Sequence, residues 1–292
     1  IVETASGSQL NSMMMRSYLQ KGHSLPQASP EEDYEGAISM GNPGIYRNAY
    51  KVDVASLYPS IMIYYKVYDK AKDPLGNMLT MVEIFTAERL KNKKLAKETK
   101  IKYYDDMQNA QKIVINSFYG FLGAGGLLFN SPKNAAFVTE KGREIIQKAS
   151  LWGCGHQFKH IIDPDTLGKA KEKWIWVNDE IITDKHHGFV IVNADTDSIT
   201  IADPEGRELS IEERKTLLDD LNSNFPERIR FEDDGYFPTV IVLKSKNYIL
   251  WDGKKVKVKG SAMKDAKKEK ALKEFLNRIV QSIIDGTNGY ID

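Results

Sequence analysis

Residues 189–201, with the sequence FVIVNADTDSITI, decide the architecture that the chain predicts. Two runs rich in valine and isoleucine, 189–193 and 198–201, flank the polar tip Ala194-Asp195-Thr196-Asp197. Apolar runs on either side of a short polar segment are typical of a β-hairpin. Elsewhere helical patterns and short strands interleave without a strand–helix–strand rhythm, so we expect an α+β fold with an antiparallel sheet.

The remaining pattern predicts a set of elements around that hairpin. Residues 1–33 are expected to be irregular or weakly helical because Pro26 and Pro30 break regular structure. Helical patterns are at 60–67, 86–121, 139–152, 211–222 and 265–284, and the second is long enough to predict two helices. Further strands are expected at 51–57, 174–177, 181–183, 239–243 and 248–251, with 174–177 and 181–183 forming a hairpin.

Composition limits the class of protein. The chain has 292 residues, a formal charge of +1 and a single cysteine, Cys154, which excludes an internal disulfide. No apolar run approaches the length needed to span a bilayer, and no signal peptide is visible, so we expect an intracellular protein. Lysine-rich stretches at 89–102 and 254–273 indicate local contact with a polyanion or, alternatively, ordinary solvated helices.

Three carboxylates stand among apolar residues. Asp53 ends an apolar segment, and Asp195 and Asp197 lie two apart, so they would share a face if the strand continues through them. Burying such acids is costly unless a hard divalent cation neutralises them. Two such ions would suit an in-line phosphoryl displacement. The alternative is an ordinary turn, but an EF-hand is excluded because Thr200 stands where its glycine is required.

A second pattern lies on the predicted helices. Lys112, Asn116 and Tyr119 follow an i, i+4, i+7 spacing and therefore share one helix face. Arg89 and Lys93 share a face of the preceding helix. A cation, an amide and an aromatic ring in a row suit a triphosphate, a sugar and a base, and two adjacent helices could direct all three cations at one anion. A solvated amphipathic helix pair explains the spacing equally well.

Five motifs together resemble those of family B DNA polymerases. Any one of them would be a weak signal, but they occur in the order of that family and cover residues 34–250. They are YEGA at 34–37, DVASLYPS at 53–60, KIVINSFYG at 112–120, DTDS at 195–198 and KNY at 246–248.

The resemblance implies a right-hand polymerase fold: a palm of antiparallel sheet with backing helices, short helical-hairpin fingers and the start of a thumb. The lead-in from an exonuclease domain would be 1–33, the palm 34–71 and 123–252, the fingers 72–122 and a partial thumb 253–292. No exonuclease motif precedes Tyr34. We therefore expect a core cut from a longer viral or phage-like polymerase, whose exonuclease domain and remaining thumb lie elsewhere in the parent protein.

The resemblance also implies the catalytic and metal-binding roles. Asp53, Asp197 and the Val54 carbonyl would bind two Mg²⁺ ions, for which Mn²⁺ could substitute. Asp195 would be a supporting catalytic acid near the primer 3′-OH.

Substrate contacts follow from the same resemblance. The triphosphate would meet the backbone amides of Ser56 and Leu57 and the side chains of Arg89, Lys93 and Lys112. Tyr58 would lie under the sugar and exclude a 2′-hydroxyl, while Asn116 and Tyr119 would shape the nascent base pair. The DNA would be held by Tyr34, Gly36, Ala37, Lys246 and Tyr248.

The sequence therefore predicts an enzyme, a monomeric template-directed DNA polymerase core with primer–template DNA and deoxynucleoside triphosphates as partners and no membrane contact. A non-catalytic nucleic-acid-binding scaffold is the main alternative, and a metal-dependent nuclease is the second. If the source is a virus or phage, the protein would act in the host cytoplasm. Cys154, His156 and His160 could also be zinc ligands, but they have no fourth ligand nearby.

Overall fold

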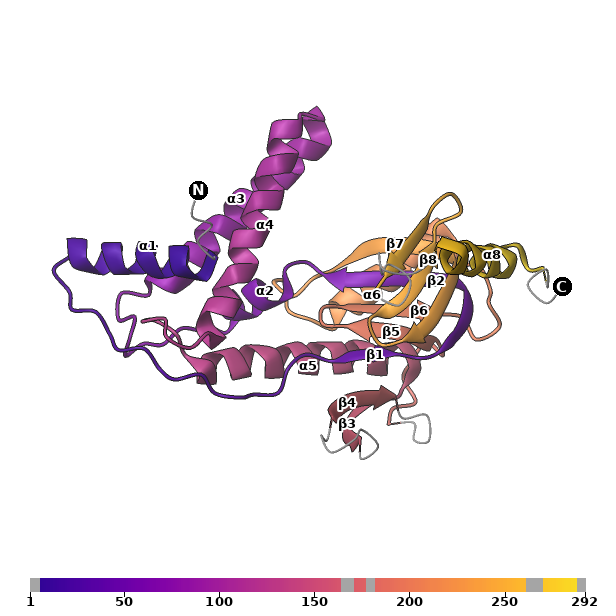
Figure 1. Cartoon of the computed structure of the whole chain (residues 1–292), viewed down its shortest axis with the longest axis horizontal. Helices are drawn as coiled ribbons and strands as arrows, with labels where there is room; N and C mark the ends of the chain where they lie inside the picture. The colour runs from indigo at the N-terminus through magenta and orange to yellow at the C-terminus, as the bar shows by residue number, and fades with distance from the viewer. Residues whose placement is uncertain (1–5, 164–170, 177–181, 261–269, 288–292) are drawn as a thin grey trace. The chain divides into compact units, whose positions relative to one another are not determined.

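The computed structural model describes residues 6–163, 171–176, 182–260 and 270–287 (Figure 1). The chain forms two compact units, each assembled from separate segments of sequence. Unit 1 comprises residues 1–37, 55–144 and 226–230, and unit 2 comprises 38–54, 145–225 and 231–292.

Unit 1 is helical in its described part. Its elements are α1 (Ser6–Gln20), α2 (Leu57–Tyr64), α3 (Asn77–Thr99), α4 (Lys102–Gly123) and the first part of α5 (Pro132–Cys154). The weakly helical lead-in of the sequence contains α1, and α2 begins three residues earlier than expected. Pro59 lies in the first turn of α2, where its missing N–H leaves no hydrogen bond unmade.

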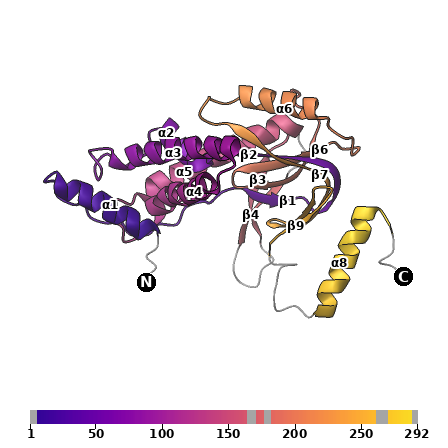
Figure 2. The same ribbon diagram turned by 90° about the horizontal axis from the view of Figure 1, so that it is seen from above.

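Helices α3 and α4 form an antiparallel hairpin, as the length of the pattern predicted (Figure 2). The break falls at Lys100, which ends α3 in a left-handed conformation with φ of 57°. The start of α3 is earlier than expected because the Asp73 carboxylate accepts the backbone N–H groups of Asn77 and Met78, at 3.0 and 2.9 Å. An acceptor for amides that lack an intrahelical partner stabilises the beginning of a helix.

Unit 2 is built on a curled seven-stranded sheet in the order β1-β5-β6-β2-β7-β8-β9, with every neighbouring pair antiparallel (Figure 1). The strands are β1 (Ser39–Gly41), β2 (Gly44–Val54), β5 (Val190–Asp195), β6 (Ser198–Ala202), β7 (Phe231–Lys244), β8 (Asn247–Trp251) and β9 (Val256–Lys259). The predicted β5–β6 hairpin and the α+β class are confirmed. Strand β2 ends at Val54, before the expected end at 57.

The two faces of β2 differ in burial. Val52 and Val54 are buried at 1% exposure, whereas Lys51 and Asp53 alternate with them on the other face. Helices cover the apolar side of the sheet: a Cβ added at Gly153, on α5, would contact Ile191 and Ile201 at 3.4 and 3.7 Å. Core side chains lie on the carboxylate face as well, because Ala49, two residues before Lys51 on β2, is buried in a cluster with Phe237 and Tyr248.

Strands β3 (Phe158–Asp163) and β4 (Lys171–Trp176) correct two expectations. They pair with each other as a separate antiparallel sheet. The sequence predicted no strand at 158–163, and it predicted that 174–177 pairs with 181–183. The predicted turn at 178–179 lies outside the described residues, but Ile182 and Thr183 belong to no strand.

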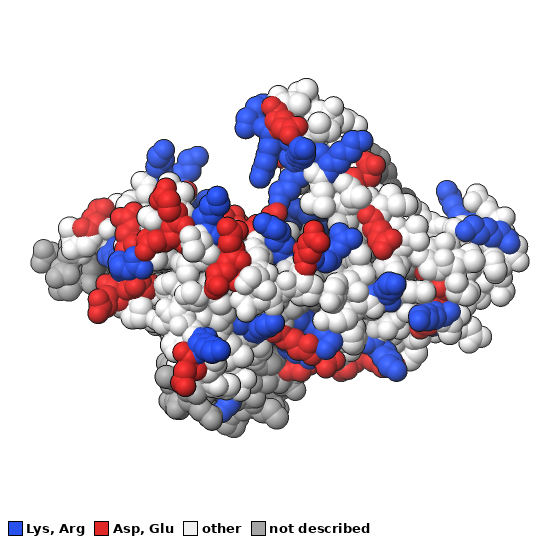
Figure 3. Space-filling model, turned by 180° about the vertical axis from the view of Figure 1, so that it is seen from behind, with Lys and Arg blue, Asp and Glu red and all other residues white. Residues whose placement is uncertain are grey.

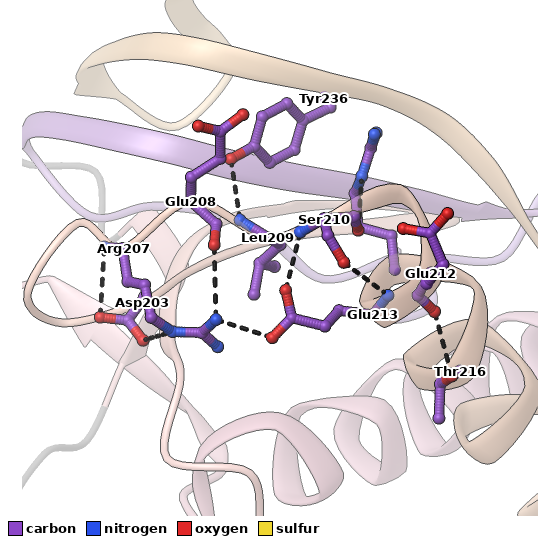
Figure 4. A network of polar contacts seen from close by, with 10 residues as sticks. Asp203, Arg207, Glu208, Leu209, Ser210, Glu212, Glu213, Thr216 and Tyr236 are labelled. Atoms are coloured by element: carbon purple, nitrogen blue, oxygen red, sulfur yellow. Dashed lines mark hydrogen bonds and ion pairs between the residues drawn. The ribbon is translucent and has the colours of Figure 1, made fainter.

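Helix α6 (Ile211–Ser223) begins with a reciprocal cap (Figure 4). The Ser210 hydroxyl accepts the Glu213 backbone N–H at 3.1 Å, and the Glu213 carboxylate accepts the Ser210 N–H at 2.7 Å. Arg207 adds ion pairs to Glu213 and Asp203. Such a capping box satisfies two otherwise unpaired amides, which explains why the helix begins directly after Ser210.

Helix α8 (Lys270–Asp285) packs on the sheet of its own unit. Val280 and Ile284 bury against Ile241 and Ile249. Arg47 on β2 donates to the carbonyl of Ile283 at 2.8 Å, which ties the end of α8 to the sheet. In the described part of the chain, no helix combines the length and apolar character that a membrane crossing requires. The subdivision into palm, fingers and thumb stays a prediction.

Candidate active site

The carboxylates of unit 2 come from β2, from β5 and from the turn between β5 and β6, which lies next to β2. Asp53 on β2 lies opposite Ser198 on β6, and the Val54 N–H donates to the Asp197 backbone carbonyl at 2.7 Å. Asp195 is the last residue of β5 and also lies opposite Ser198. Strand pairing thus brings Asp53 and the turn that carries Asp195 and Asp197 to the same end of the sheet.

The tip of the β5–β6 hairpin is a strained turn and not a continued strand. Thr196 has a φ of 57°, and the Asp197 N–H donates to the Asp195 carbonyl at 2.7 Å, which closes a three-residue turn. A positive φ is unusual for a β-branched residue. The expectation that Asp195 and Asp197 share a face as neighbours on one strand is therefore wrong, because the strand ends at Asp195.

The acids repel one another. Burial is the main factor that raises the pKa of Asp53 to about 6, and the carboxylates of Asp234 and Asp197 raise it further. Lys51 acts in the opposite direction, and Glu232 adds to the repulsion. A half-buried carboxylate beside other acids is a suitable donor for a hard cation, which would relieve this repulsion.

The donor set near Asp53 is small. Among the described residues, no three His, Cys, Asp or Glu side chains come close enough to one another to enclose a metal ion. Two carboxylates with a backbone carbonyl, completed by substrate oxygens, are the arrangement by which Mg²⁺ usually binds in phosphoryl-transfer sites. Asp53, Asp197 and Val54 fit that arrangement, whereas Cys154 is buried and takes part in no such cluster.

Two residues beside the carboxylates, Lys51 and Ser39, were not selected from the sequence. Lys51 forms an ion pair with Asp234 on β7, and its side chain is only 13% exposed. Lys51 and Asp53 are two apart on β2, so the lysine lies on the carboxylate face. The Ser39 hydroxyl donates to Asp195 at 3.5 Å and contacts the Ser245 hydroxyl at 2.7 Å. Only the three-dimensional strand pairing joins these residues, so no local signal marks them.

Asp53→Asn is expected to stabilise the protein in metal-free buffer. The raised pKa means that the ionised carboxylate is disfavoured in the folded state, so stability is lost as the pH rises from 3.8 to about 6. Full conversion of that shift would give about 3 kcal/mol, and partial exposure reduces the expected gain to about 1 kcal/mol. The gain should be present at pH 8 and vanish near pH 4, measured by thermal unfolding in EDTA. A gain that is equal at both pH values would contradict the electrostatic cause.

The nucleotide-binding residues predicted near Ser56 lie in unit 1. Ser56 precedes α2 with a left-handed φ of 53°, and its hydroxyl accepts a hydrogen bond from the Arg89 guanidinium. Arg89 is 9% exposed, which is unusual for an arginine. The first amides of α2 have no intrahelical acceptor, a feature that favours anion binding.

Three tyrosines form a second group in unit 1. The rings of Tyr58 and Tyr119 lie 4.3 Å apart between centroids at 42°, and the Tyr34 and Tyr119 hydroxyls are 3.3 Å apart. Burial and the hydrogen bond with Tyr34 raise the pKa of Tyr119. A Cβ at Gly142, on α5, would lie 3.1 Å from the Tyr58 ring. A glycine inside a helical pattern is a signal of close approach that the sequence analysis did not use.

Gly123→Ala is expected to destabilise unit 1. A Cβ at this position would collide with the Tyr34 hydroxyl, and overpacking of this kind costs about 1–3 kcal/mol. The double variant Gly123→Ala with Tyr34→Phe should recover most of the loss, because it removes the colliding oxygen. Urea unfolding of the parent, both single variants and the double variant measures the coupling. An additive double variant would show that the collision with Tyr34 is not the cause.

The helical hairpin carries the remaining predicted phosphate contacts. Asn92 donates to Gln111 at 3.0 Å, which sets the register between α3 and α4. Lys112 therefore stands at the level of the α3 turn that carries Arg89 and Lys93. Lys112 and Asn116 are exposed. That these three cations bind one anion stays a prediction.

The segment at 34–37 is held by α5. Arg143 donates to the carbonyls of Glu35 and Gly36, both at 2.8 Å, and forms an ion pair with the Glu35 carboxylate at 3.1 Å. The Thr139 hydroxyl donates to the Glu35 carbonyl at 3.0 Å. Neither α5 residue was selected from the sequence. Ala37, the last residue of the segment, is half-buried.

The predicted primer-contacting residues belong to unit 2. Lys246 is exposed in the turn between β7 and β8, with a φ of 58°. Tyr248 is buried on β8, and burial raises its pKa. Lys51 opposes that rise, while Asp195 and Asp197 contribute to it, so Tyr248 is within electrostatic reach of the acids. The roles of all these residues stay predictions.

Comparisons with known proteins complete the description of the site. The chain is 25% identical over 284 residues to a DNA polymerase of Thermococcus gorgonarius, covering 88% of this chain and 33% of that protein. It is 24% identical over 283 residues to DNA polymerase 1 of Saccharolobus solfataricus, covering 86% and 28%. The chain therefore spans about a third of the length of these relatives. They are archaeal, so they give no support to a viral or phage-like source.

A solved structure and a family profile agree with these relatives. The family B DNA polymerase of Pyrobaculum calidifontis superposes with a TM-score of 0.57 at 18% identity, over 97% of this chain and 38% of that one. The likeness confirms a fold similar to a fragment of a family B polymerase. The profile of DNA polymerase family B matches residues 68–289. The chain therefore belongs to DNA polymerase family B.

Proposed function

We propose that this chain is the catalytic core of a template-directed DNA polymerase, which adds deoxynucleotides to a primer 3′-OH by a reaction with two metal ions. One observation supports the proposal more strongly than the others do. The Val54 N–H donates to the Asp197 backbone carbonyl at the end of β2, and the Asp197 carboxylate raises the pKa of Asp53, so two acids of distant sequence interact. A scaffold that only binds nucleic acid would need no such pair of mutually repelling acids.

The residues of unit 2 would act on the primer end. Asp53, Asp197 and the Val54 carbonyl would hold Mg²⁺, which when bound would acidify the primer 3′-OH and stabilise charge on the leaving phosphate. Asp195 would help to position the 3′ end. Tyr248 and Lys246 would hold the primer strand without reading its sequence.

The residues of unit 1 would act on the nucleotide. Arg89, Lys93 and Lys112 would neutralise the triphosphate, together with the first amides of α2 at Ser56 and Leu57. The primer oxygen forms a new bond to the α-phosphorus, the bond from that phosphorus to the β-phosphate oxygen breaks, and pyrophosphate leaves. Catalysis of this step consists of positioning and electrostatic stabilisation.

The side chains around Tyr119 would select the nucleotide. Tyr58 packs against Tyr119 and close to Gly142, so its ring has little freedom to move. A fixed ring under the sugar would exclude a 2′-hydroxyl. Asn116 and Tyr119 would contact the nascent pair, and the segment at Tyr34, Gly36 and Ala37 would contact the DNA.

Primer extension tests the proposal directly. A labelled primer annealed to a longer template is incubated with the chain, Mg²⁺ and all four deoxynucleotides, beside samples that contain EDTA or an unrelated template. Extension that follows the template sequence and stops in EDTA would support the proposal. Shortening of the primer would favour a nuclease with the same acids. DNA binding without extension would favour the scaffold.

A further inference from the structure

A pocket of about 440 Å³ lies at the outer end of the α3–α4 hairpin, beyond the predicted triphosphate contacts. Lysines dominate its polar lining, and Figure 3 shows basic side chains gathered toward the end of this hairpin. The polar lining residues are Lys93, Lys97, Lys100, Lys102, Asp105 and Gln108. Four cations thus surround the pocket with one carboxylate, and no aromatic ring takes part.

The pocket continues a row of cations along α3. Arg89, Lys93 and Lys97 follow an i, i+4, i+8 spacing on one side of α3, and Lys100 follows as the residue that ends the helix. Each of the three cations on the helix is separated from the next by a rise of about 6 Å. That rise is shorter than the screening length of about 8–10 Å at physiological salt. An anion that moves outward from Arg89 therefore stays within reach of a positive charge until it enters the pocket.

The lysines of the pocket differ in their existing partners. Lys102 is already paired with Asp106. Within the described part of the chain, neither Lys97 nor Lys100 forms an ion pair, so their charges are available to a ligand. Lys100 also occupies a left-handed position that glycine or asparagine fills at lower cost. A lysine at such a position places a charge in the pocket at the expense of the local conformation.

We propose that this pocket binds a phosphate chain that carries no base, as a second phosphate site joined to the triphosphate contacts through Lys93. The inference rests on the proposed function, in which the reaction releases pyrophosphate. A single phosphate would leave most of the lysine charge unmatched. Single-stranded nucleic acid would be expected to stack its bases on aromatic rings, which the lining does not offer.

The test removes the two lysines that have no ion pair. Lys97→Gln with Lys100→Asn keeps a residue that tolerates the left-handed position. Lys91→Gln with Lys94→Gln removes the same charge from parts of α3 outside the pocket. Both pairs are introduced into the parent and into Lys112→Gln, which weakens the predicted triphosphate contact. Calorimetric titration with inorganic pyrophosphate in magnesium-free buffer measures the affinity.

The pocket variant is expected to bind pyrophosphate at least about tenfold more weakly, because two charge-assisted contacts are lost. The control variant should stay within about twofold of its parent. Equal weakening in both variants, or no weakening in the pocket variant, would overturn the proposal. Weakened binding of a dT₁₆ oligonucleotide with unchanged pyrophosphate binding would also overturn it and assign the surface to nucleic acid.

Two further titrations identify the source of the phosphate chain. If dATP loses affinity in the pocket variant as strongly as pyrophosphate does, the site receives the triphosphate tail of the entering nucleotide. If only pyrophosphate does, the site receives the leaving group, which supports the proposal, whereas a dATP loss of the same size would overturn a site for a chain without a base. Asp197→Ala should bind pyrophosphate at the pocket as the parent does. The two proposals can fail separately. If the parent does not extend a primer but Lys97→Gln with Lys100→Asn weakens its pyrophosphate binding, the proposed function is wrong and the pocket proposal stands.

Discussion

Asp197→Ala is expected to lower the rate of template-directed primer extension by about 10³-fold or more, the scale on which a preorganised electrostatic group contributes to a transition state. The variant removes one of two carboxylates that we propose as Mg²⁺ ligands. Single-turnover extension with saturating deoxynucleotide measures the rate of the chemical step.

Asp197→Ala should remove the carboxylate and keep the backbone contact of this residue. Asp197 is tied to β2 through its backbone carbonyl, which accepts the Val54 N–H at 2.7 Å, and alanine keeps that bond. The substitution also removes a neighbour that raises the pKa of Asp53. Thermal stability should therefore be retained while the reaction is lost.

An exposed acid of the same unit provides the matched control. Asp219 on α6 is exposed, and Asp219→Ala should extend the primer at the parental rate. DNA binding by Asp197→Ala should also match the parent. If Asp197→Ala retained more than about a tenth of the parental rate, its role as a metal ligand would be wrong.

Tyr58→Ala is expected to reduce discrimination against ribonucleotides by about 10²-fold or more. The Tyr58 ring lies 4.3 Å from Tyr119 between centroids, and its edge is close to Gly142 on α5. Removing the ring opens space where a 2′-hydroxyl would otherwise collide, and a permissive pocket rejects an added hydroxyl only weakly. The measurement is the ratio of kcat/KM for a deoxynucleotide to that for the matching ribonucleotide.

Tyr58→Phe separates the ring from its hydroxyl. It keeps the contacts with Tyr119 and Gly142, so it should reject ribonucleotides as the parent does. Tyr119→Phe serves as a second comparison, because it leaves the Tyr58 ring in place. Unchanged ribonucleotide rejection by Tyr58→Ala would assign sugar selection to another residue.

Local periodicity accounts for the parts of the fold that could be predicted. The β5–β6 hairpin and the division between α3 and α4 follow from the chain's own pattern, because strands and amphipathic helices repeat over a few residues. Strand β3 was missed because its apolar residues continue those at the end of α5. The predicted partner of β4 was wrong for a different reason: strand pairing depends on tertiary structure, which periodicity does not report.

The candidate site likewise contains residues that could be predicted from the sequence and residues that could not. Asp53, Asp195 and Asp197 could be selected because acids inside apolar segments are costly and therefore informative. The Lys51–Asp234 pair joins β2 to β7 and could not be selected, since each residue alone resembles an ordinary surface charge. Arg143 likewise gains its role only when α5 meets the segment at 34–37.

The central position of β2 in the sheet affects how unit 2 unfolds locally. Residues 50–53 pair with β6 on one side and β7 on the other, whereas β1 and β9 lie at the edges of the sheet. Edge strands fray with little loss of free energy, while a central strand separates only when the sheet unfolds as a whole. Amide hydrogens around Asp53 should therefore be among the last to exchange with solvent. Partial opening at either edge would leave the Asp53 carboxylate in the position that the proposed reaction requires.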